Sequence, residues 1–202
     1  MTARKSSQDR KNEILAATLD LAFQVGPTHV TTGMIATRFG LTQPAIYKHF
    51  PKKEDIWRGV TDKLCARIHA NANIAPLSDN APIAHVRQLI LGHLQLVSEV
   101  PALPEIMVTR DATGNLTETR RRIQEAMGEY RAALERSLQQ ARLAGQLKSE
   151  LSVDDSVSLL FGIIQSLVLR LLVSRSTFPL MQDGERLLDM QLALFRNEGH
   201  LS

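Results

Sequence analysis

The sequence has few of the residues that build sheets, disulfides or secretory signals. Aromatic residues make up only 4% of its 202 residues, and few stretches alternate β-branched and polar residues, so a strand pattern is nearly absent. The single cysteine, Cys65, excludes an internal disulfide. The stretch that begins the sequence lacks the apolar core of a secretory signal, and we therefore expect a cytoplasmic protein.

The most apolar stretch, residues 157–173, is unlike a membrane span. It is interrupted by Ser158, Gln165, Ser166 and Arg170, and it falls short of the roughly 20 apolar residues that a span needs. A buried helix explains it better. Because hydrophobic residues make up 44% of the chain, a sizeable core can be buried. We expect an all-α globular fold.

Apolar residues at helical spacing predict about nine helices. They are expected near residues 9–24, 32–39, 44–49, 53–73, 83–99, 103–111, 116–145, 153–174 and 184–197. Thr31 is the expected N-cap of the second helix, and Gly40 ends it with the positive φ of a tight turn. Pro44 suits the first turn of the third helix. Either Thr42 or Gln43 caps that helix, and the steric bias of a residue before proline favours Gln43.

Charge is concentrated in the first quarter of the chain. Residues 1–53 hold eight Lys or Arg and three acidic residues, a net charge of +5, whereas the rest carries −2. This asymmetry suggests a basic head that meets a polyanion and a neutral body with another role. A solvated, lysine-rich amino terminus would give the same count.

Two short helices joined by Phe39-Gly40-Leu41 fit a helix-turn-helix, whose second helix enters the major groove of DNA. An ordinary helical hairpin fits this outline too, but residues 14–57 resemble the TetR family of bacterial transcriptional regulators. The matching positions are Ile14, Leu15, Gly26, Thr31, Thr32, Ile35, Ala36, Gly40, Tyr47, Phe50, Lys53 and Glu54. The resemblance implies an N-terminal three-helix DNA-binding domain, residues 1–52, and a helical effector-binding and dimerisation domain, residues 53–202.

The same resemblance implies a set of DNA contacts. The pair Gln43 and Pro44 looks like a Gln-Pro pair of the tetracycline repressor, so Gln43 would pair with an adenine edge and Pro44 would contact a thymine methyl group. Ala45 would let the backbone approach, and Lys48 would reach phosphate or a base. The other expected contacts are mainly to phosphate. The complete set is Thr32, Thr42, Gln43, Pro44, Ala45, Tyr47, Lys48, His49, Lys52 and Lys53.

Two positions depart from the family pattern. Gly33 stands where the tetracycline repressor has a base-reading arginine, which implies a different operator. Lys52 replaces the usual Ser or Thr N-cap and, with Lys53, puts two cations at a helix amino terminus, which favours a bound anion there. Glu54 and Asp55 could instead neutralise the pair. Four further cations form either an arm onto the DNA or a tail without a role: Arg4, Lys5, Arg10 and Lys11.

Small residues recur every four positions in the eighth predicted helix, at Ser158, Gly162 and Ser166. Such a stripe lets another helix approach closely. Family members dimerise through their last two helices, although the stripe could also pack within one subunit. The expected apolar surface is Val157, Leu160, Ile164, Val168, Leu171 and Leu172. A two-fold dimer would bind a roughly palindromic operator.

His93 lies on the apolar face of its predicted helix and, if buried, needs a hydrogen-bond partner from a ligand or from the core. Other residues that could line an effector pocket, or belong to an ordinary core, are Met107, Met127, Tyr130, Phe161 and Gln165. Cys65 and His69 share a helix face, but two ligands do not make a metal site. We expect no metal, no cofactor and, because no catalytic motif is present, no enzyme activity.

These features predict a dimeric, nucleoid-associated DNA-binding regulator, a repressor that a small-molecule effector releases. One alternative keeps DNA binding but replaces the small molecule with a protein partner. It rests on residues 96–107, which look somewhat like the nucleoid-occlusion branch of the family, whose members regulate cell division. Operators beside promoters would favour repression, and many sites spread along the chromosome would favour the alternative.

Overall fold

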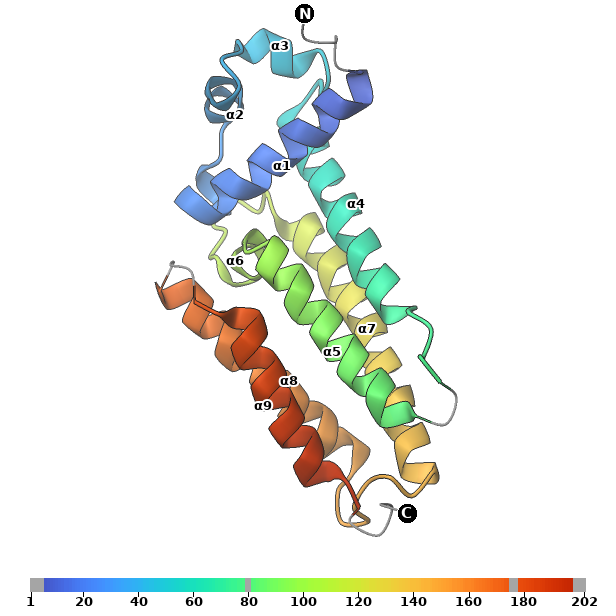
Figure 1. Ribbon diagram of the computed structural model, residues 1–202. Helices are drawn as coiled ribbons and strands as arrows, with labels where there is room; N and C mark the ends of the chain where they lie inside the picture. The colour runs from blue at the N-terminus through green and yellow to red at the C-terminus, as the bar shows by residue number, and fades with distance from the viewer. Residues whose placement is uncertain (1–5, 79–80, 175–177, 198–202) are drawn as a thin grey trace, which may run out of the picture. The chain divides into compact units, whose positions relative to one another are not determined.

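The computed structural model describes residues 6–78, 81–174 and 178–197, and its regular elements over these ranges are helices (Figure 1). They are α1 (Ser7–Val25), a short 3-10 helix η1 (Pro27–His29), α2 (Thr32–Arg38), α3 (Gln43–Tyr47), α4 (Lys53–Ala72), α5 (Pro82–Glu99), α6 (Ala102–Val108), α7 (Thr117–Leu143), α8 (Val153–Ser174) and α9 (Leu180–Phe195). The nine α-helices of the described residues confirm the all-α prediction.

Packing divides the chain into two compact units, each built from two segments. The first unit comprises residues up to 66 and residues 100–124, and the second comprises residues 67–99 and residues from 125 onward. Helices α4 and α7 are each continuous across the division. The assignment of DNA binding to residues 1–52 and of effector binding and dimerisation to residues 53–202 is a division by function, and it stays a proposal.

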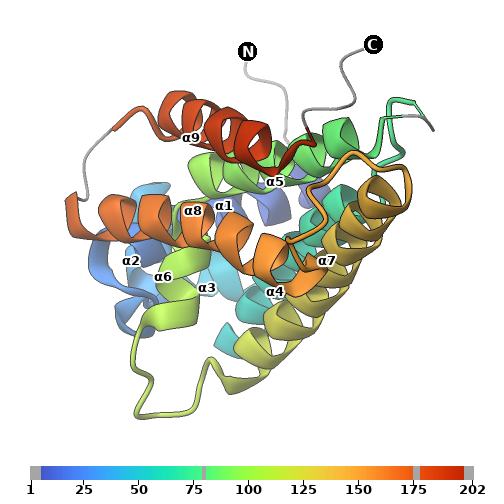
Figure 2. The same ribbon diagram turned by 90° about the horizontal axis from the view of Figure 1, so that it is seen from below.

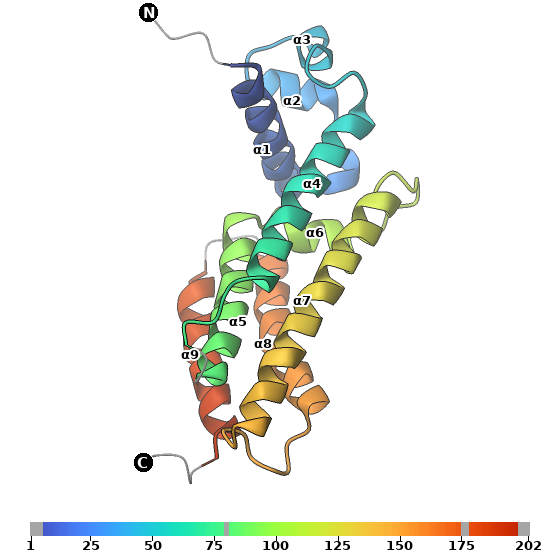
Figure 3. The same ribbon diagram turned by 90° about the vertical axis from the view of Figure 1, so that its right-hand side faces the viewer.

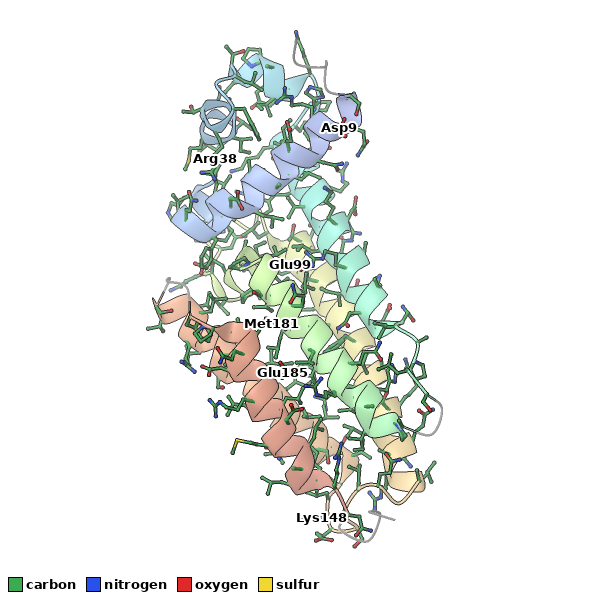
Figure 4. All side chains as sticks on the ribbon, in the orientation of Figure 1. Asp9, Arg38, Glu99, Lys148, Met181 and Glu185 are labelled. Carbon is green, nitrogen blue, oxygen red and sulfur yellow. The ribbon has the colours of Figure 1, made fainter. Side chains whose placement is uncertain are left out.

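In the first unit, α1 begins two residues earlier than predicted because Ser6 and Asp9 form a capping box. The backbone N–H of Asp9 donates to Ser6 Oγ at 3.0 Å, and the backbone N–H of Ser6 donates to Asp9 Oδ2 at 3.2 Å (Figure 4 labels Asp9). Arg38 at the end of α2 pairs with Asp20 of α1 at 3.4 Å. The core beneath includes three fully buried isoleucines, one from each of the first three α-helices: Ile14, Ile35 and Ile46.

In the second unit, α8 and α9 run antiparallel and lie side by side, with α5 against α9 (Figure 2). Gly184 makes the α5–α9 contact possible, because a Cβ at this position would lie 2.5 Å from Leu94 Cδ1. The predicted start of this helix at residue 184 was wrong. Helix α9 begins at Leu180, and Gly184 is a buried residue inside it. Across the same contact, Arg87 of α5 pairs with Asp189 at 2.7 Å and with Glu185 at 2.5 Å.

Among the described residues, α8 is long and apolar enough to cross a membrane by length and composition alone. Its residues Val157, Leu160 and Leu167 are nevertheless fully buried within the chain. A helix with this pattern is typical of the core of a helical protein, as the sequence predicted for this stretch.

Candidate nucleic-acid interface

A tight turn at Gly40 joins α2 to α3 (Figure 3). Gly40 has φ +62°, its N–H donates to Thr37 O at 3.1 Å, and the N–H of Leu41 donates to Ala36 O at 2.9 Å. These two bonds make a Schellman motif, in which glycine takes the left-handed conformation at little steric cost. At the other end of α2, Thr31 Oγ1 accepts from the N–H of Met34 at 3.1 Å, so the predicted N-cap is confirmed.

Ile46 is the side chain that α3 buries in the first unit. Ile46 is completely buried, whereas Thr42, Gln43, Pro44 and Lys48 are exposed. Tyr47 is 42% exposed, and Ala45 and His49 are half-buried. Most of the residues that were predicted to contact DNA therefore lie on an exposed face of α3.

The predicted cap of α3 needs a correction. Thr42 is the N-cap, with extended dihedral angles, and Gln43 is the first helical residue, so the preference for Gln43 as the cap was wrong. The steric bias before proline is only a preference. Here it is offset by the bond from Ala45 N to Thr42 O at 3.0 Å and by a side-chain bond of Gln43.

That side-chain bond belongs to a small polar network between α2 and α3. Gln43 Nε2 donates to Thr32 Oγ1 at 3.2 Å, and the hydroxyl groups of Thr32 and Tyr47 are 3.3 Å apart. Thr32 is only 6% exposed. Three of the predicted DNA-contact residues are thus bonded to one another, and the sequence did not predict these bonds.

At the start of α4, Asp55 bonds to the backbone of Lys52 and to the side chain of Arg58. Asp55 Oδ2 accepts from the backbone N–H of Lys52 at 3.0 Å, and Asp55 Oδ1 pairs with Arg58 at 3.0 Å. Within the part of the chain that the structure describes, the ammonium groups of Lys52 and Lys53 have no ion-pair partner. Lys52 is exposed and Lys53 is half-buried. Both charges therefore remain available to an anion.

Arg10 and Lys11 belong to α1, so the expectation that they form part of an arm or tail was wrong for these two. The capping box at Ser6 starts the helix ahead of them. Arg10 lies over the Phe39 ring and Lys11 over the Phe50 ring, each 5.9 Å from the centroid. Arg4 and Lys5 lie outside the described residues.

The expected dimer stripe is open on α8. Ser158, Gly162 and Ser166 are all exposed, and a Cβ at Gly162 would have no heavy atom within 4 Å. Ser152 caps the start of α8, since the N–H of Asp155 donates to Ser152 Oγ at 3.0 Å. Nothing within this chain covers the stripe among the described residues.

The apolar surface predicted beside that stripe was largely wrong. Val157, Leu160, Ile164 and Leu171 are buried within the chain, while Val168 and Leu172 are half-buried. The exposed apolar side chains are instead Leu159, Leu169 and Val173 of α8 and Met190 and Leu194 of α9. A helix that is apolar all round has two faces to cover, and the spacing of its apolar residues does not say which face lies inside the chain.

The predicted pocket residues fall into three groups. His93, Tyr130 and Phe161 meet in the second unit: the His93 and Tyr130 rings stack with centroids 5.0 Å apart, and Phe161 meets Tyr130 edge-on at 6.1 Å. Met127 is half-buried on α7, and Gln165 is exposed on α8. Met107 is half-buried on α6, which belongs to the first unit.

His93 is 5% exposed, and burial lowers the pKa of its imidazole to about 4. Its ring nitrogens have no hydrogen-bond partner among the described residues. Tyr130 is completely buried and donates its hydroxyl to Leu89 O at 3.1 Å, and burial raises its pKa. At neutral pH the imidazole of His93 is therefore uncharged.

The described residues contain no group of three or more His, Cys, Asp and Glu side chains placed to hold a metal ion. Of the two candidates on α4, Cys65 is buried and His69 Nε2 lies 3.4 Å from Glu129 Oε2.

Two family models match the sequence. The model for bacterial regulatory proteins of the tetR family matches residues 14–60, and that for the tetracyclin repressor-like C-terminal domain matches residues 108–182. Together they cover more than half of the chain. The chain belongs to the TetR family. Membership makes it a DNA-binding transcriptional regulator of the cytoplasm rather than an enzyme.

Individual relatives are similar over most of the chain. The HTH-type transcriptional regulator TtgR of Pseudomonas putida is 25% identical over 198 residues, 96% of this chain and 94% of that protein. The nucleoid occlusion factor SlmA of a Marinomonas species is 21% identical over 157 residues, 78% of this chain and 80% of that protein.

Solved structures of the family share the fold. NalD of Pseudomonas aeruginosa, described as the secondary repressor of the MexAB-OprM multidrug efflux pump, superposes with a TM-score of 0.66 and 19% identity, over 96% of this chain and 100% of that one. SmeT, solved as a complex with triclosan, has a TM-score of 0.66 and 23% identity, over 95% of this chain and 93% of that one.

Proposed function

We propose that this TetR-family regulator represses transcription by binding an operator through α3 and that a small molecule releases it. The observation that carries the proposal is the open face of α3, whose buried side chain is Ile46 and which is followed by two lysines without ion-pair partners among the described residues. The amide of Gln43 and the ring of Pro44 begin this exposed helix and are suited to base edges. The lysines that follow are suited to phosphate.

Dimerisation through α8 and α9 is part of the proposal. The open stripe of Ser158, Gly162 and Ser166 is flanked by the exposed apolar residues of both helices. This face includes a hollow of about 410 Å³ at the end of α8, lined by Leu169, Arg170, Val173, Ser174 and Phe178. A second copy would cover the apolar side chains, and its α3 would read the second half of a roughly palindromic operator.

The cluster of His93, Tyr130 and Phe161 in the second unit is the proposed point of effector contact, with Met127 and Gln165 of the same unit as further candidates. Its rings are uncharged at neutral pH, so it suits an uncharged, partly aromatic molecule that forms one hydrogen bond with His93. The crystallised complex of SmeT with triclosan supports an effector of this general class.

The same cluster is connected to α4. Leu89 O, which accepts from the Tyr130 hydroxyl, also accepts from Asn71 Nδ2 at 3.0 Å. Asn71 lies near the end of α4, a continuous helix that is separated from α3 by five residues. A ligand that displaces the Tyr130 ring would remove one of the two donors to Leu89 O, and Asn71 of α4 is the other donor. This shared acceptor gives the proposed release a physical route.

The similarity to SlmA favours a second candidate function. In that case the chain associates with many chromosomal sites and binds a protein partner in place of the small molecule. The similarity to TtgR covers more of the chain at higher identity, and it supports the first candidate.

Replacement of Gln43 by alanine tests direct readout by α3. We expect Gln43→Ala to cost about 1–3 kcal/mol at the preferred operator and to relax the preference at one base pair in each half-site. Binding to a panel of operators with single base changes measures both effects. The matched variant Lys53→Ala should weaken all of these sequences alike and lower the salt dependence of binding. An unchanged base preference in Gln43→Ala would count against readout by this side chain.

A further inference from the structure

Gly33, in the first turn of α2, lies directly beside the side chain of Gln43. A Cβ built at Gly33 would be 3.0 Å from Gln43 Nε2 and 3.8 Å from Gln43 Cδ. The amide of Gln43 thus fills the space that a side chain at position 33 would need. Gly33 is not among the glycines with positive φ, so its backbone does not require glycine.

Glycine inside a helix is otherwise less favourable than alanine. Its presence at position 33 is therefore explained by the neighbouring amide. The resemblance to the tetracycline repressor describes Gly33 only as the loss of an arginine, whereas the structure shows that this loss creates room for another side chain.

Thr32 holds the amide in that room. Its Oγ1 accepts from Gln43 Nε2 at 3.2 Å and lies 3.3 Å from the Tyr47 hydroxyl. Because Thr32 is 6% exposed, its hydroxyl has little access to water, and loss of these partners would leave a buried polar group unsatisfied. The bond therefore opposes free rotation of the Gln43 side chain.

We propose that Gly33 and Thr32 are positioning residues that set which base Gln43 prefers, without contacting a base themselves. Gly33 supplies the space and Thr32 supplies the hydrogen bond, so the amide meets the major groove from one fixed position. A bond used by Thr32 leaves Gln43 Oε1 and the second N–H for the base edge, which is enough for a two-bond contact with adenine. This inference rests on the proposed DNA-binding function.

The test uses Gly33→Ala in the full-length protein. The added methyl group meets the far end of a flexible side chain, so the variant should fold and unfold at the same or a higher temperature. Its amide at position 43 must move, however. Selection from randomised duplex DNA, followed by sequencing, should show that preference at the Gln43-dependent base pair falls by about 5-fold or more.

Three further variants separate positioning from a general structural effect. Thr32→Val should lose the same preference as Gly33→Ala, and Thr32→Ser should keep it because the hydroxyl remains. Adding Gly33→Ala to Gln43→Ala should change nothing further, since the side chain to be positioned is gone. Gly128→Ala, a helical glycine of α7 with no heavy atom within 4 Å of its added Cβ, should leave the preference intact.

The inference is overturned if Gly33→Ala keeps the wild-type preference at the base pair that Gln43→Ala alters. It is equally overturned if Gly33→Ala shifts the selected sequence in the absence of the Gln43 amide. A wild-type protein that selects no sequence at all would overturn the DNA-binding function itself, and that result is visible before any variant is compared.

Discussion

His93 shows how one buried side chain can make this fold sensitive to pH. Burial lowers the pKa of its imidazole from 6.5 to about 4, and no hydrogen bond among the described residues compensates. Between these two values the unfolded chain carries a proton on His93 and the folded chain does not. The contribution of His93 is therefore fully present above pH 6.5, and it declines as the pH falls toward 4.

We expect His93→Phe to remove this part of the pH dependence. A shift of this size corresponds to about 3 kcal/mol between pH 6.5 and pH 4, and the phenyl ring can still stack on Tyr130. The free energy of unfolding in urea, measured for both proteins across this range, gives the difference. His29→Gln changes an exposed histidine and should leave the wild-type slope. Parallel curves for the wild type and His93→Phe would show that His93 is not the group responsible.

The sequence predicted the burial of His93 but not its surroundings. Helical periodicity identifies the face on which a residue lies, and it placed His93 on an apolar face that the structure buries. Hydrogen bonds between side chains on different helices depend on rotamers and on the crossing of those helices. The Thr32–Gln43–Tyr47 network and the Leu89–Asn71–Tyr130 contact were therefore beyond prediction from the sequence alone.

Gly40 controls the turn that sets α3 against α2. Its φ of +62° lies in the left-handed region, and a Cβ there would meet no heavy atom within 4 Å. Gly40→Ala should therefore destabilise the fold through backbone strain alone, by about 1 kcal/mol.

The urea unfolding midpoint measures this effect, and Gly128→Ala is the matched control. Gly128 also has open space around its added Cβ, but it lies inside α7, where alanine should stabilise the protein by up to ~1 kcal/mol. Opposite signs for the two substitutions are the expected result. Equal gains in stability would mean that the turn at Gly40 does not need a left-handed residue.

The bounds of a helix were predictable where its capping residues and the spacing of its apolar residues agreed. The bounds of α8 match the prediction at both ends, because Ser152 caps it and its apolar pattern is long. The bounds were predicted wrongly where a glycine could either end a helix or lie inside one. Gly40 ends a helix, whereas Gly184 serves a close contact with Leu94 inside one, and sequence spacing does not distinguish these roles.

The division of the apolar residues of α8 between the core and the exposed face required the structure. Because α8 is apolar on nearly all sides, the sequence could not tell the buried residues Leu160 and Leu167 from the exposed residues Leu169 and Val173. The small-residue stripe was recognised, since four-residue spacing is independent of how the chain packs.

Leu169→Glu should break the proposed dimer without unfolding the chain. Leu169 is 62% exposed, so a carboxylate is tolerated in a single chain but would be buried without a partner between two copies. Sedimentation should show mainly monomer at concentrations where the wild type is dimeric. Leu143→Glu alters a residue of α7 that is 79% exposed, and it should leave the dimer intact. A dimeric Leu169→Glu would place the interface elsewhere.

Repression through α3 can be tested by mapping, across the genome of the source bacterium, the DNA that this regulator binds. We expect a small number of sites beside promoters that share an inverted repeat. We also expect Gln43→Ala to lose one base preference in each half of that repeat. Numerous sites spread along the chromosome away from promoters, or sites without two-fold symmetry, would contradict repression through α3.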